Sequence, residues 1–289
     1  MQVRTYDDWQ AFATAAAPVL ESDEVGHCLV YTIQETLRDS PDPQHRPWLA
    51  VIADAEGTAC AIAAMLPPNP LILSPLTPPA AIALLAAALV DGGRVDDVGR
   101  VVGRPDVVTG FAQAWRERTG RDGHVHTRMR LHRIDAAPSV PATSGYFSPM
   151  TADDVDMVVQ WFAEFTREAW GEDVEPAQVA PRIRARLASS AGGLVVWRDG
   201  DVAVSMAGYG GMTPTGARIG PVYTPPAHRG HGYASALTAA VTRQLFERGR
   251  RSCFLFTDTA NPTSNAIYAA IGYRPVADHV RVDIDRPTG

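Results

Sequence analysis

The sequence predicts an α/β (α+β) protein built from two related domains in tandem, each with a mixed, mostly antiparallel sheet flanked by helices. Three observations support this fold class. Helical and strand patterns interleave along the second half of the chain. Short segments of the first half recur in the second half in the same order. A Pro-rich run of small residues, 136–145, has the composition of a linker between the two copies.

The internal repeat rests on segments of matching pattern. Leu49 and Leu194 each begin an apolar strand that runs into an Asp- and Gly-containing turn and a second apolar strand. The tetrapeptide that starts at Thr77 (Thr-Pro-Pro-Ala) returns at Thr224, and the Asp pair at Asp7 returns at Asp153. We therefore predict two domains, 1–140 and 146–289.

Each element of the second copy has a local reason. Thr151 is a helix N-cap before apolar residues at helical spacing, and Gly249 and Gly272 are residues that end helices. Alternating or continuous apolar runs bounded by turn residues predict the strands. The predicted helices are 151–169, 176–188, 233–248 and 264–270, and the predicted strands are 194–198, 202–209, 218–224, 253–257 and 279–285.

Composition excludes several classes of protein. The net charge of −6 over 289 residues argues against a nucleic-acid binder. The longest apolar run, 80–90, is too short to cross a bilayer, and no signal-peptide core follows Met1. The 3 cysteines lie far apart, so we predict neither a zinc site nor a disulfide framework, and no metal. We expect a cytoplasmic protein that contacts no membrane and no nucleic acid.

A glycine-rich turn, residues 224–235, lies between a predicted strand and a long helix. Glycines let the backbone approach a ligand, and the N–H groups of a helix N-terminus favour phosphate. A plain turn explains the glycines equally well. A P-loop needs Lys, which the chain lacks, and Ser235 stands where a dinucleotide fingerprint needs Gly or Ala. The pattern Arg-x-x-Gly-x-Ala is met by Arg229, Gly232 and Ala234.

At this turn the sequence resembles the GNAT superfamily of acyl-CoA-dependent N-acyltransferases. The resemblance continues at residues 261–273, where Asn261 precedes a short helix that carries Tyr268 and ends in Gly272-Tyr273. It covers residues 146–289. The first copy matches only through the repeat and has no Arg-Gly-His-Gly loop after Thr77, so it resembles a degenerate GNAT-like domain without a cofactor site.

The resemblance implies that acetyl-CoA is the cosubstrate and assigns roles by position. Tyr268 would be the catalytic residue that supplies a proton or hydrogen bond to the leaving thiolate. A splayed strand interrupted by Pro221 would polarise the thioester carbonyl through a backbone N–H. The implied cofactor-binding residues are Val222, Tyr223, Thr224, Arg229, Gly230, His231, Gly232, Tyr233, Ala234, Ser235, Asn261 and Asn265.

The general base stays open at this point. Asp258, His231 and Glu164 are candidates, and an amine that arrives neutral needs no base. Glu164 or Glu168 on the first helix of the second copy would favour an amine acceptor.

We expect an N-acetyltransferase that moves an acetyl group to a primary amine of a small molecule or peptide by direct attack in a ternary complex. The alternatives are a non-catalytic acyl-CoA-binding sensor or scaffold and a nucleotide-phosphate binder unrelated to acyl transfer. The identity of the acceptor, the acyl chain length and a homodimeric state are left open.

Overall fold

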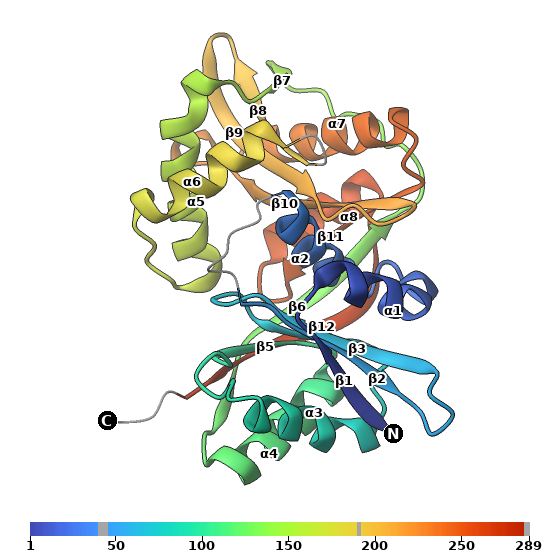
Figure 1. Ribbon diagram of the computed structural model, residues 1–289. Helices are drawn as coiled ribbons and strands as arrows, with labels where there is room; N and C mark the ends of the chain where they lie inside the picture. The colour runs from blue at the N-terminus through green and yellow to red at the C-terminus, as the bar shows by residue number, and fades with distance from the viewer. Residues whose placement is uncertain (40–45, 190–191, 286–289) are drawn as a thin grey trace. The chain divides into compact units, whose positions relative to one another are not determined.

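The computed structural model describes residues 1–39, 46–189 and 192–285. The described part of the chain divides into two compact units. The first unit consists of Met1–Arg130 and Ala277–Gly289, and the second of Leu131–Val276. Each unit is described by itself (Figure 1).

The first unit has helices on both faces of a mostly antiparallel sheet (Figure 1). Strands β1 to β4 pair antiparallel in sequence order, β4 pairs parallel with β5, and β5 pairs antiparallel with β12. Its elements are β1 Gln2–Tyr6, α1 Trp9–Ser22, α2 Cys28–Asp39, β2 Trp48–Ala53, β3 Ala59–Met65, β4 Leu71–Leu73, α3 Pro79–Asp91, β5 Arg100–Gly103, α4 Pro105–Thr119 and the start of β6 Gly123–Ile134.

The second unit repeats this order of helices and strands. Strands β7, β8, β9 and β10 pair antiparallel in sequence order, and β10 pairs parallel with β11. Its elements are β7 Tyr146–Pro149, the 3-10 turn η1 Ala152–Asp154, α5 Val155–Trp170, α6 Pro176–Ala188, β8 Gly193–Asp199, β9 Val202–Gly210, β10 Gly216–Tyr223, the 3-10 turn η2 Pro226–His228, α7 Tyr233–Glu247, β11 Ser252–Asp258, α8 Pro262–Ile271 and the start of β12 Arg274–Ile284.

The order of elements confirms the fold class, a mixed α/β structure with a mostly antiparallel sheet flanked by helices. The expected helices and strands of the second copy are present, with ends shifted by a few residues. The last strand differs most, because β12 begins at Arg274 rather than at His279.

The predicted N-cap at Thr151 is a capping box. The Thr151 backbone N–H donates to the Asp154 carboxylate, and the Thr151 side chain accepts from the Asp154 backbone N–H. Asp154 also forms a salt bridge of 2.5 Å with Arg198 on β8. This ties the start of α5 to the sheet and so sets where α5 crosses it.

Two apolar cores lie on opposite faces of the second unit's sheet. Along β9, Val204 and Ala207 belong to the core under α7 and α8, whereas Ala203 and Met206 belong to the core under α5 and α6. Alternation along a strand explains most of this division. In β10, Ala217 and Ile219 face the α7/α8 core, but Tyr223 joins the α5/α6 core after a shift of register between Ile219 and Val222.

The compact units differ from the predicted halves at the final strand. Residues from Ala277 onward group with the first unit, where Val280 and Val282 pair with Gly103 and Val101 of β5. The prediction placed all of 146–289 in one domain. Strand pairing between residues far apart in the sequence decides this membership, and no local pattern encodes it. Residues 286–289 of the predicted domain lie outside the described residues.

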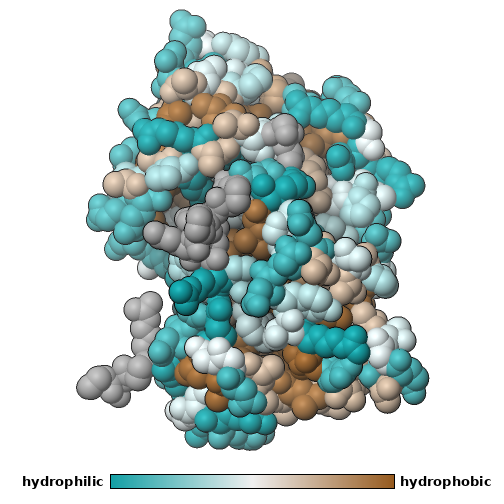
Figure 2. Space-filling model, in the orientation of Figure 1, coloured by the Kyte–Doolittle hydropathy of each residue, from teal (hydrophilic) through white to brown (hydrophobic). Residues whose placement is uncertain are grey.

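On the face drawn in Figure 2, polar residues predominate and apolar residues form separate small patches. Within the described parts of the chain, no helix combines the length and the apolar character needed to cross a membrane.

Candidate active site

Strand β10 diverges from its neighbour in the middle of the second unit's sheet. The parallel ladder joins Gly216–Arg218 of β10 to Ser252–Phe254 of β11. Beyond it, Val222 and Tyr223 are paired with β9 on the other side, after the register shift at Pro221. Since Pro has no N–H to donate to a ladder, a bulge here follows from the residue type. The ladder between β10 and β11 thus ends at Arg218, before Val222.

The glycine turn leads from this strand into α7. Gly230 has φ +84° and Gly232 has φ +81°, a region that favours glycine. Gly232 is the N-cap of α7, and no side chain caps this helix. The first N–H groups of a helix have no partner within it, so those of the first turn of α7 are available to a ligand. Residues Arg229 to Gly232 are exposed, which leaves the turn accessible.

Neighbouring side chains hold the turn in place. Thr143 Oγ1 donates to the carbonyl oxygen of His231 at 2.7 Å, and the His231 ring stacks on Tyr233 with centroids 5.4 Å apart. The Tyr233 hydroxyl donates to Asp199 at 2.6 Å, and this bond, with that of Ser144, lowers the pKa of Asp199. His231 and Tyr233 thus shape the turn from within, while Ala234 and Ser235 continue it into α7 as half-buried residues.

The side chain of Arg229 points to the α5 side of the turn. Its Nη2 lies 2.6 Å from Glu168 Oε2, its Nε donates to the Thr224 carbonyl oxygen at 2.9 Å, and its guanidinium lies over the Tyr223 ring. The positive charge of Arg229, which the sequence analysis assigned to a pyrophosphate, is paired with the Glu168 carboxylate in this structure. Backbone N–H groups therefore remain the principal donors of the turn.

Tyr223 is the centre of a polar cluster that the sequence did not predict. Its hydroxyl lies 3.0 Å from a carboxylate oxygen of Glu164 and 3.0 Å from one of Glu168. Burial and these two carboxylates raise the pKa of the Tyr223 hydroxyl above its ordinary value. The sequence analysis assigned a role only to the backbone of Tyr223. The signal that could have found the cluster is the i, i+4 spacing of the two glutamates, which places both on one flank of α5.

The strand end around Tyr223 is fixed by β9. Ser205 Oγ donates to the Tyr223 carbonyl oxygen at 3.1 Å and lies 2.9 Å from Thr224 Oγ1. The Thr224 and Tyr223 carbonyl groups are therefore used within the protein, and the half-buried Val222 lies beyond the end of the ladder to β11.

Tyr268 is 9% exposed and packs edge-to-face against Tyr273, with ring centroids 6.1 Å apart. Burial raises the pKa of its hydroxyl to about 12, so the phenol keeps its proton at neutral pH. Across the described residues, its hydroxyl makes no hydrogen bond, whereas Tyr273 is bonded to Thr242 at 2.7 Å. Tyr268 thus retains a proton that is not committed to another protein group.

The two asparagines of this segment have structural partners. Asn261 is the N-cap of α8, and its Oδ1 accepts from Ser264 N at 3.0 Å. Asn265 Nδ2 donates to the carbonyl oxygens of Asp258 and Asn261, and its Oδ1 accepts from Thr257. These bonds fix the start of α8 and so the position of Tyr268. A cofactor contact from either side chain would come in addition to this role.

The other candidate bases are less well placed for proton transfer. Asp258 Oδ1 accepts from Ala260 N in the turn before α8, and His231 stacks on Tyr233. Glu164, with Glu168, is the candidate that the structure brings to the end of the diverging strand.

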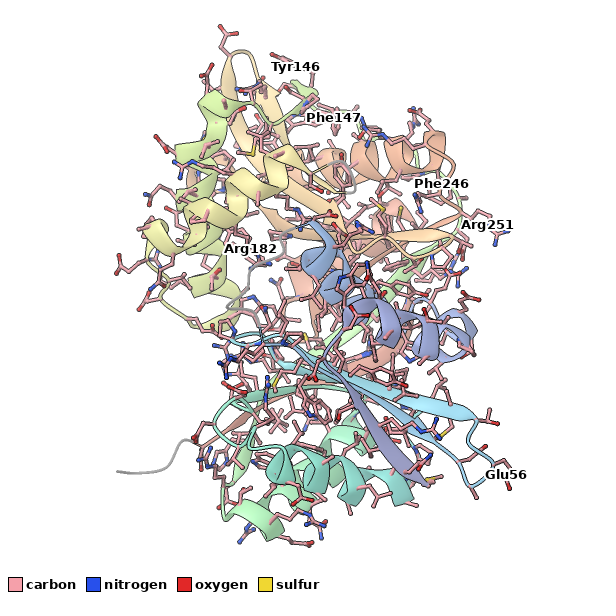
Figure 3. All side chains as sticks on the ribbon, in the orientation of Figure 1. Glu56, Tyr146, Phe147, Arg182, Phe246 and Arg251 are labelled. Carbon is pink, nitrogen blue, oxygen red and sulfur yellow. The ribbon has the colours of Figure 1, made fainter. Side chains whose placement is uncertain are left out.

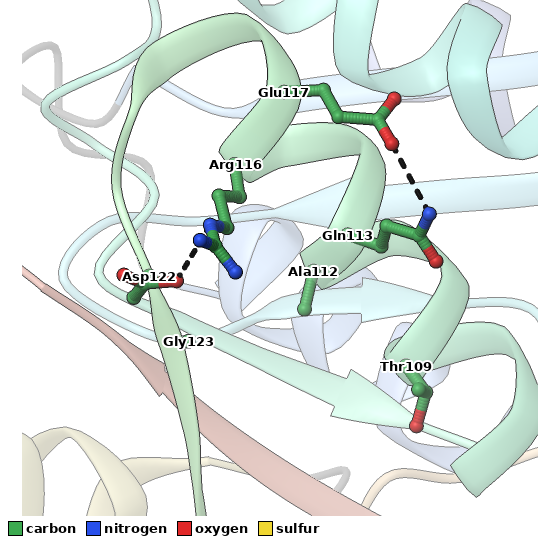
Figure 4. A pocket seen from close by; sticks show the side chains of 7 residues that line it. All are labelled: Thr109, Ala112, Gln113, Arg116, Glu117, Asp122 and Gly123. Carbon is green, nitrogen blue, oxygen red and sulfur yellow. Dashed lines mark hydrogen bonds and ion pairs between the residues drawn. The ribbon is translucent and has the colours of Figure 1, made fainter.

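The first unit differs at the corresponding positions. Helix α3 begins at Pro79 directly after Pro78, and Arg116 on α4 stands four residues before Gly120, as Tyr268 stands four before Gly272. Arg116 pairs with Asp122 at 3.1 Å on the wall of an open recess, where Gln113 also bonds Glu117 (Figure 4). A charged, exposed pair takes the place of the buried phenol.

No group of three or more His, Cys, Asp or Glu residues in the described ranges is arranged to hold a metal ion. The proposed chemistry uses none.

The comparisons with known proteins agree with this fold. Residues 155–273 match the acetyltransferase (GNAT) family. The matched segment runs from the start of α5 through the glycine turn to Tyr273. The second half of the chain therefore carries a domain of the GNAT superfamily.

Solved structures with this fold span nearly the whole chain. A GCN5-related N-acetyltransferase from Sphaerobacter thermophilus is 20% identical, with a TM-score of 0.61 over 99% of this chain and 96% of that one. A GCN5-related N-acetyltransferase from Kribbella flavida is 17% identical, with a TM-score of 0.58 over 90% and 96%. A tandem GNAT protein from the clavulanic acid biosynthesis pathway is 13% identical, with a TM-score of 0.60 over 100% of both chains. Among curated proteins, no sequence matches the chain.

Proposed function

We propose that the second unit is an N-acetyltransferase that moves the acetyl group of acetyl-CoA to a primary amine of a small molecule or peptide, by direct attack in a ternary complex. The observation that carries this proposal is the uncapped N-terminus of α7 behind two glycines of positive φ, directly after a strand that diverges from its neighbour. The family match over the same segment supports it.

The residues present fit acetyl-CoA. Gly230 and Gly232 expose the backbone of the turn, and a Cβ built on Gly230 would meet nothing within 4 Å, so the space beside it is open. The N–H groups of Gly232 to Ser235 would hold the pyrophosphate. The backbone of Val222 would hold the pantetheine and donate to the carbonyl oxygen, a contact worth about 3 kcal/mol in such sites. When bound, acetyl-CoA supplies the acetyl group as a thioester, so that an N–C bond forms as its C–S bond breaks.

The protein's own groups would manage the protons. Glu164 or Glu168 would accept the proton that the attacking ammonium must lose, directly or through the Tyr223 hydroxyl that contacts both. Tyr268 would supply a hydrogen bond or a proton to the departing sulfur, because its hydroxyl is protonated at neutral pH and no protein group among the described residues accepts it.

The first test is ligand-dependent stability. Acetyl-CoA at about 100 times its dissociation constant would raise the free energy of unfolding by about 2.7 kcal/mol. We expect a rise in melting temperature with acetyl-CoA but not with ATP or NAD. No shift in folded protein, or an equal shift with ATP, would overturn the proposal. Binding of acetyl-CoA without transfer to any amine would favour the acyl-CoA sensor instead.

A further inference from the structure

Helix α6 carries an arginine that the proposed chemistry does not use. Arg182 is labelled in Figure 3. Its guanidinium lies over the Phe162 ring of α5, 5.2 Å from the ring centroid. Among the described residues it forms no ion pair with a carboxylate. The charged neighbour that acts on it is Arg218, which carries the same sign.

The environment of Arg182 is unfavourable for an unpaired positive charge on its guanidinium. Desolvation by the neighbouring chain, and after it the charge of Arg218, lower the pKa of Arg182 below its ordinary value. The residue nevertheless remains exposed in surface area. A solute can therefore reach the Arg182 side chain. An anion placed there would relieve both the desolvation and the repulsion.

The two arginines lie on the α5/α6 face where β10 diverges. Arg218 is the last residue of the ladder with β11, and its neighbours Ala217 and Ile219 face the opposite core. Its Nη1 would lie 3.7 Å from a Cβ built on Gly220, which places the guanidinium beside the bulge. Helix α6 covers this same face through Val179 and Ile183.

The same face carries the carboxylates. Tyr223 belongs to the α5/α6 core, and its hydroxyl contacts Glu164 and Glu168. Glu168 on this face is paired with Arg229, so Glu164 and Arg182 are the acid and the arginine that the face offers to a ligand. This is the charge pattern that complements a molecule with an ammonium and a carboxylate.

We propose that the amine acceptor carries a carboxylate, which Arg182 binds, so that the substrate class is an amino acid or a similar amino-carboxylate. This rests on the proposed function. Arg182 acts in specificity: its fork binds the carboxylate, and its charge repels an acceptor that offers only an ammonium.

The test compares matched acceptors. Phenylalanine, leucine and glycine are each offered as the free acid, the methyl ester and the decarboxylated amine, with acetyl-CoA, and release of the CoA thiol is followed. In the wild-type protein we expect kcat/KM to favour the best free acid over its ester and its amine by about 100-fold. Arg182→Gln should remove this preference, chiefly by lowering kcat/KM for the free acid, and Arg182→Lys should restore part of it.

Arg184→Gln is the matched control, because Arg184 is an exposed arginine on the same helix. It should keep the preference for the free acid. An ester or amine that reacts as well as the free acid, or a preference that survives in Arg182→Gln, would overturn the assignment of the carboxylate to Arg182.

If none of the nine compounds reacts, the melting temperature is measured with acetyl-CoA and each free acid together, and this measurement decides whether the free acid binds. A rise that is lost in Arg182→Gln supports the proposal, and its absence in the wild-type protein overturns it. Titration of every variant with acetyl-CoA separates the carboxylate proposal from the proposed function. Failure of the wild-type protein to bind acetyl-CoA contradicts the proposed function. Intact acetyl-CoA binding with no dependence on the acceptor's carboxylate contradicts the carboxylate proposal alone.

Discussion

The guanidinium of Arg229 lies 2.6 Å from the carboxylate of Glu168, in an ion pair that joins the glycine turn to α5. The two residues are 61 positions apart in the sequence. Through this pair the segment proposed to bind the phosphates is tied to the helix that carries the proposed base. It also leaves the backbone of the turn, rather than the arginine, as the main donor to a phosphate.

The first prediction concerns this division of roles. Gly232→Val should weaken acetyl-CoA binding by about 10-fold or more, because a β-branched residue disfavours φ +81° and its side chain would stand at the N-terminus of α7. Arg229→Gln should change the dissociation constant by less than about 3-fold, since its charge is already paired. Titration calorimetry measures both.

Gly249→Val is the matched control for backbone strain. Gly249 has φ +87° and follows the other end of α7, so the variant should lose similar stability and keep its acetyl-CoA affinity. Equal affinity losses for the two glycine variants would show that strain, not the site, explains Gly232.

Tyr268→Phe should lower kcat by about 100-fold and leave the dissociation constant of acetyl-CoA unchanged, because the variant removes the proton donor and keeps the ring. Steady-state kinetics and titration separate the two effects. Unchanged turnover would contradict the role of Tyr268.

Tyr273→Phe makes the same chemical change in the adjacent ring. It removes the buried hydrogen bond to Thr242 and should cost about 1–3 kcal/mol of stability while turnover stays near wild type. A fall in kcat equal to that of Tyr268→Phe would mean that packing, rather than proton donation, explains both.

Glu164→Gln tests the base. At neutral pH we expect kcat/KM to fall by about 10- to 100-fold, and the deficit to shrink as the pH approaches the pKa of the free amine, which then arrives deprotonated. The measurement is the pH profile of kcat/KM. Asp156→Asn, at an exposed position in the first turn of the same helix, is the control and should follow the wild-type pH profile. A deficit in kcat/KM of Glu164→Gln that does not change with pH would argue for a structural role of Glu164.

Buried His279 makes the stability of the first unit depend on pH. Burial lowers its pKa from 6.5 to about 4, so the unfolded chain binds the proton more tightly than the folded one. The stabilisation from keeping this group neutral is complete above about pH 6.5 and is lost as the pH falls toward 4. Burial also lowers the pKa of His27, which acts in the same direction.

By pH 5 the contribution of His279 amounts to about 2 kcal/mol. Urea unfolding at pH 7 and pH 5 measures the loss in the wild-type protein and in His279→Met. We expect the variant to lose less stability between the two pH values, whatever its stability at pH 7. Parallel losses would contradict a lowered pKa at His279.

Local sequence patterns predicted the elements around the site well. The glycines at 230 and 232, Asn261 before Pro262, and Gly272 after Ile271 define a turn, a helix start and a helix end through backbone conformation and hydrogen bonds between near neighbours. Such signals act over a few residues, so they can be recognised without the fold. The roles given to Tyr268 and the turn came from family resemblance.

Side-chain partners could not be predicted in the same way. Arg229 was expected at the phosphates and instead pairs with Glu168, and Tyr223 was expected to act through its backbone while its hydroxyl joins two glutamates of α5. Both outcomes depend on how α5 crosses the sheet. That crossing is set by packing between segments about sixty residues apart, and periodicity does not encode it.

The sequence by itself determined the order of helices and strands, their repetition along the chain, and the conformation of the glycine turn, because all three depend on residue type and short-range spacing. Tertiary structure alone decided that β12 pairs with β5, that Arg229 pairs with Glu168, and that Arg182 and Arg218 lie on the α5/α6 face of the second unit's sheet. Pairing of distant strands and the meeting of side chains from separate helices are selected by the global packing of the core, which carries no local signature.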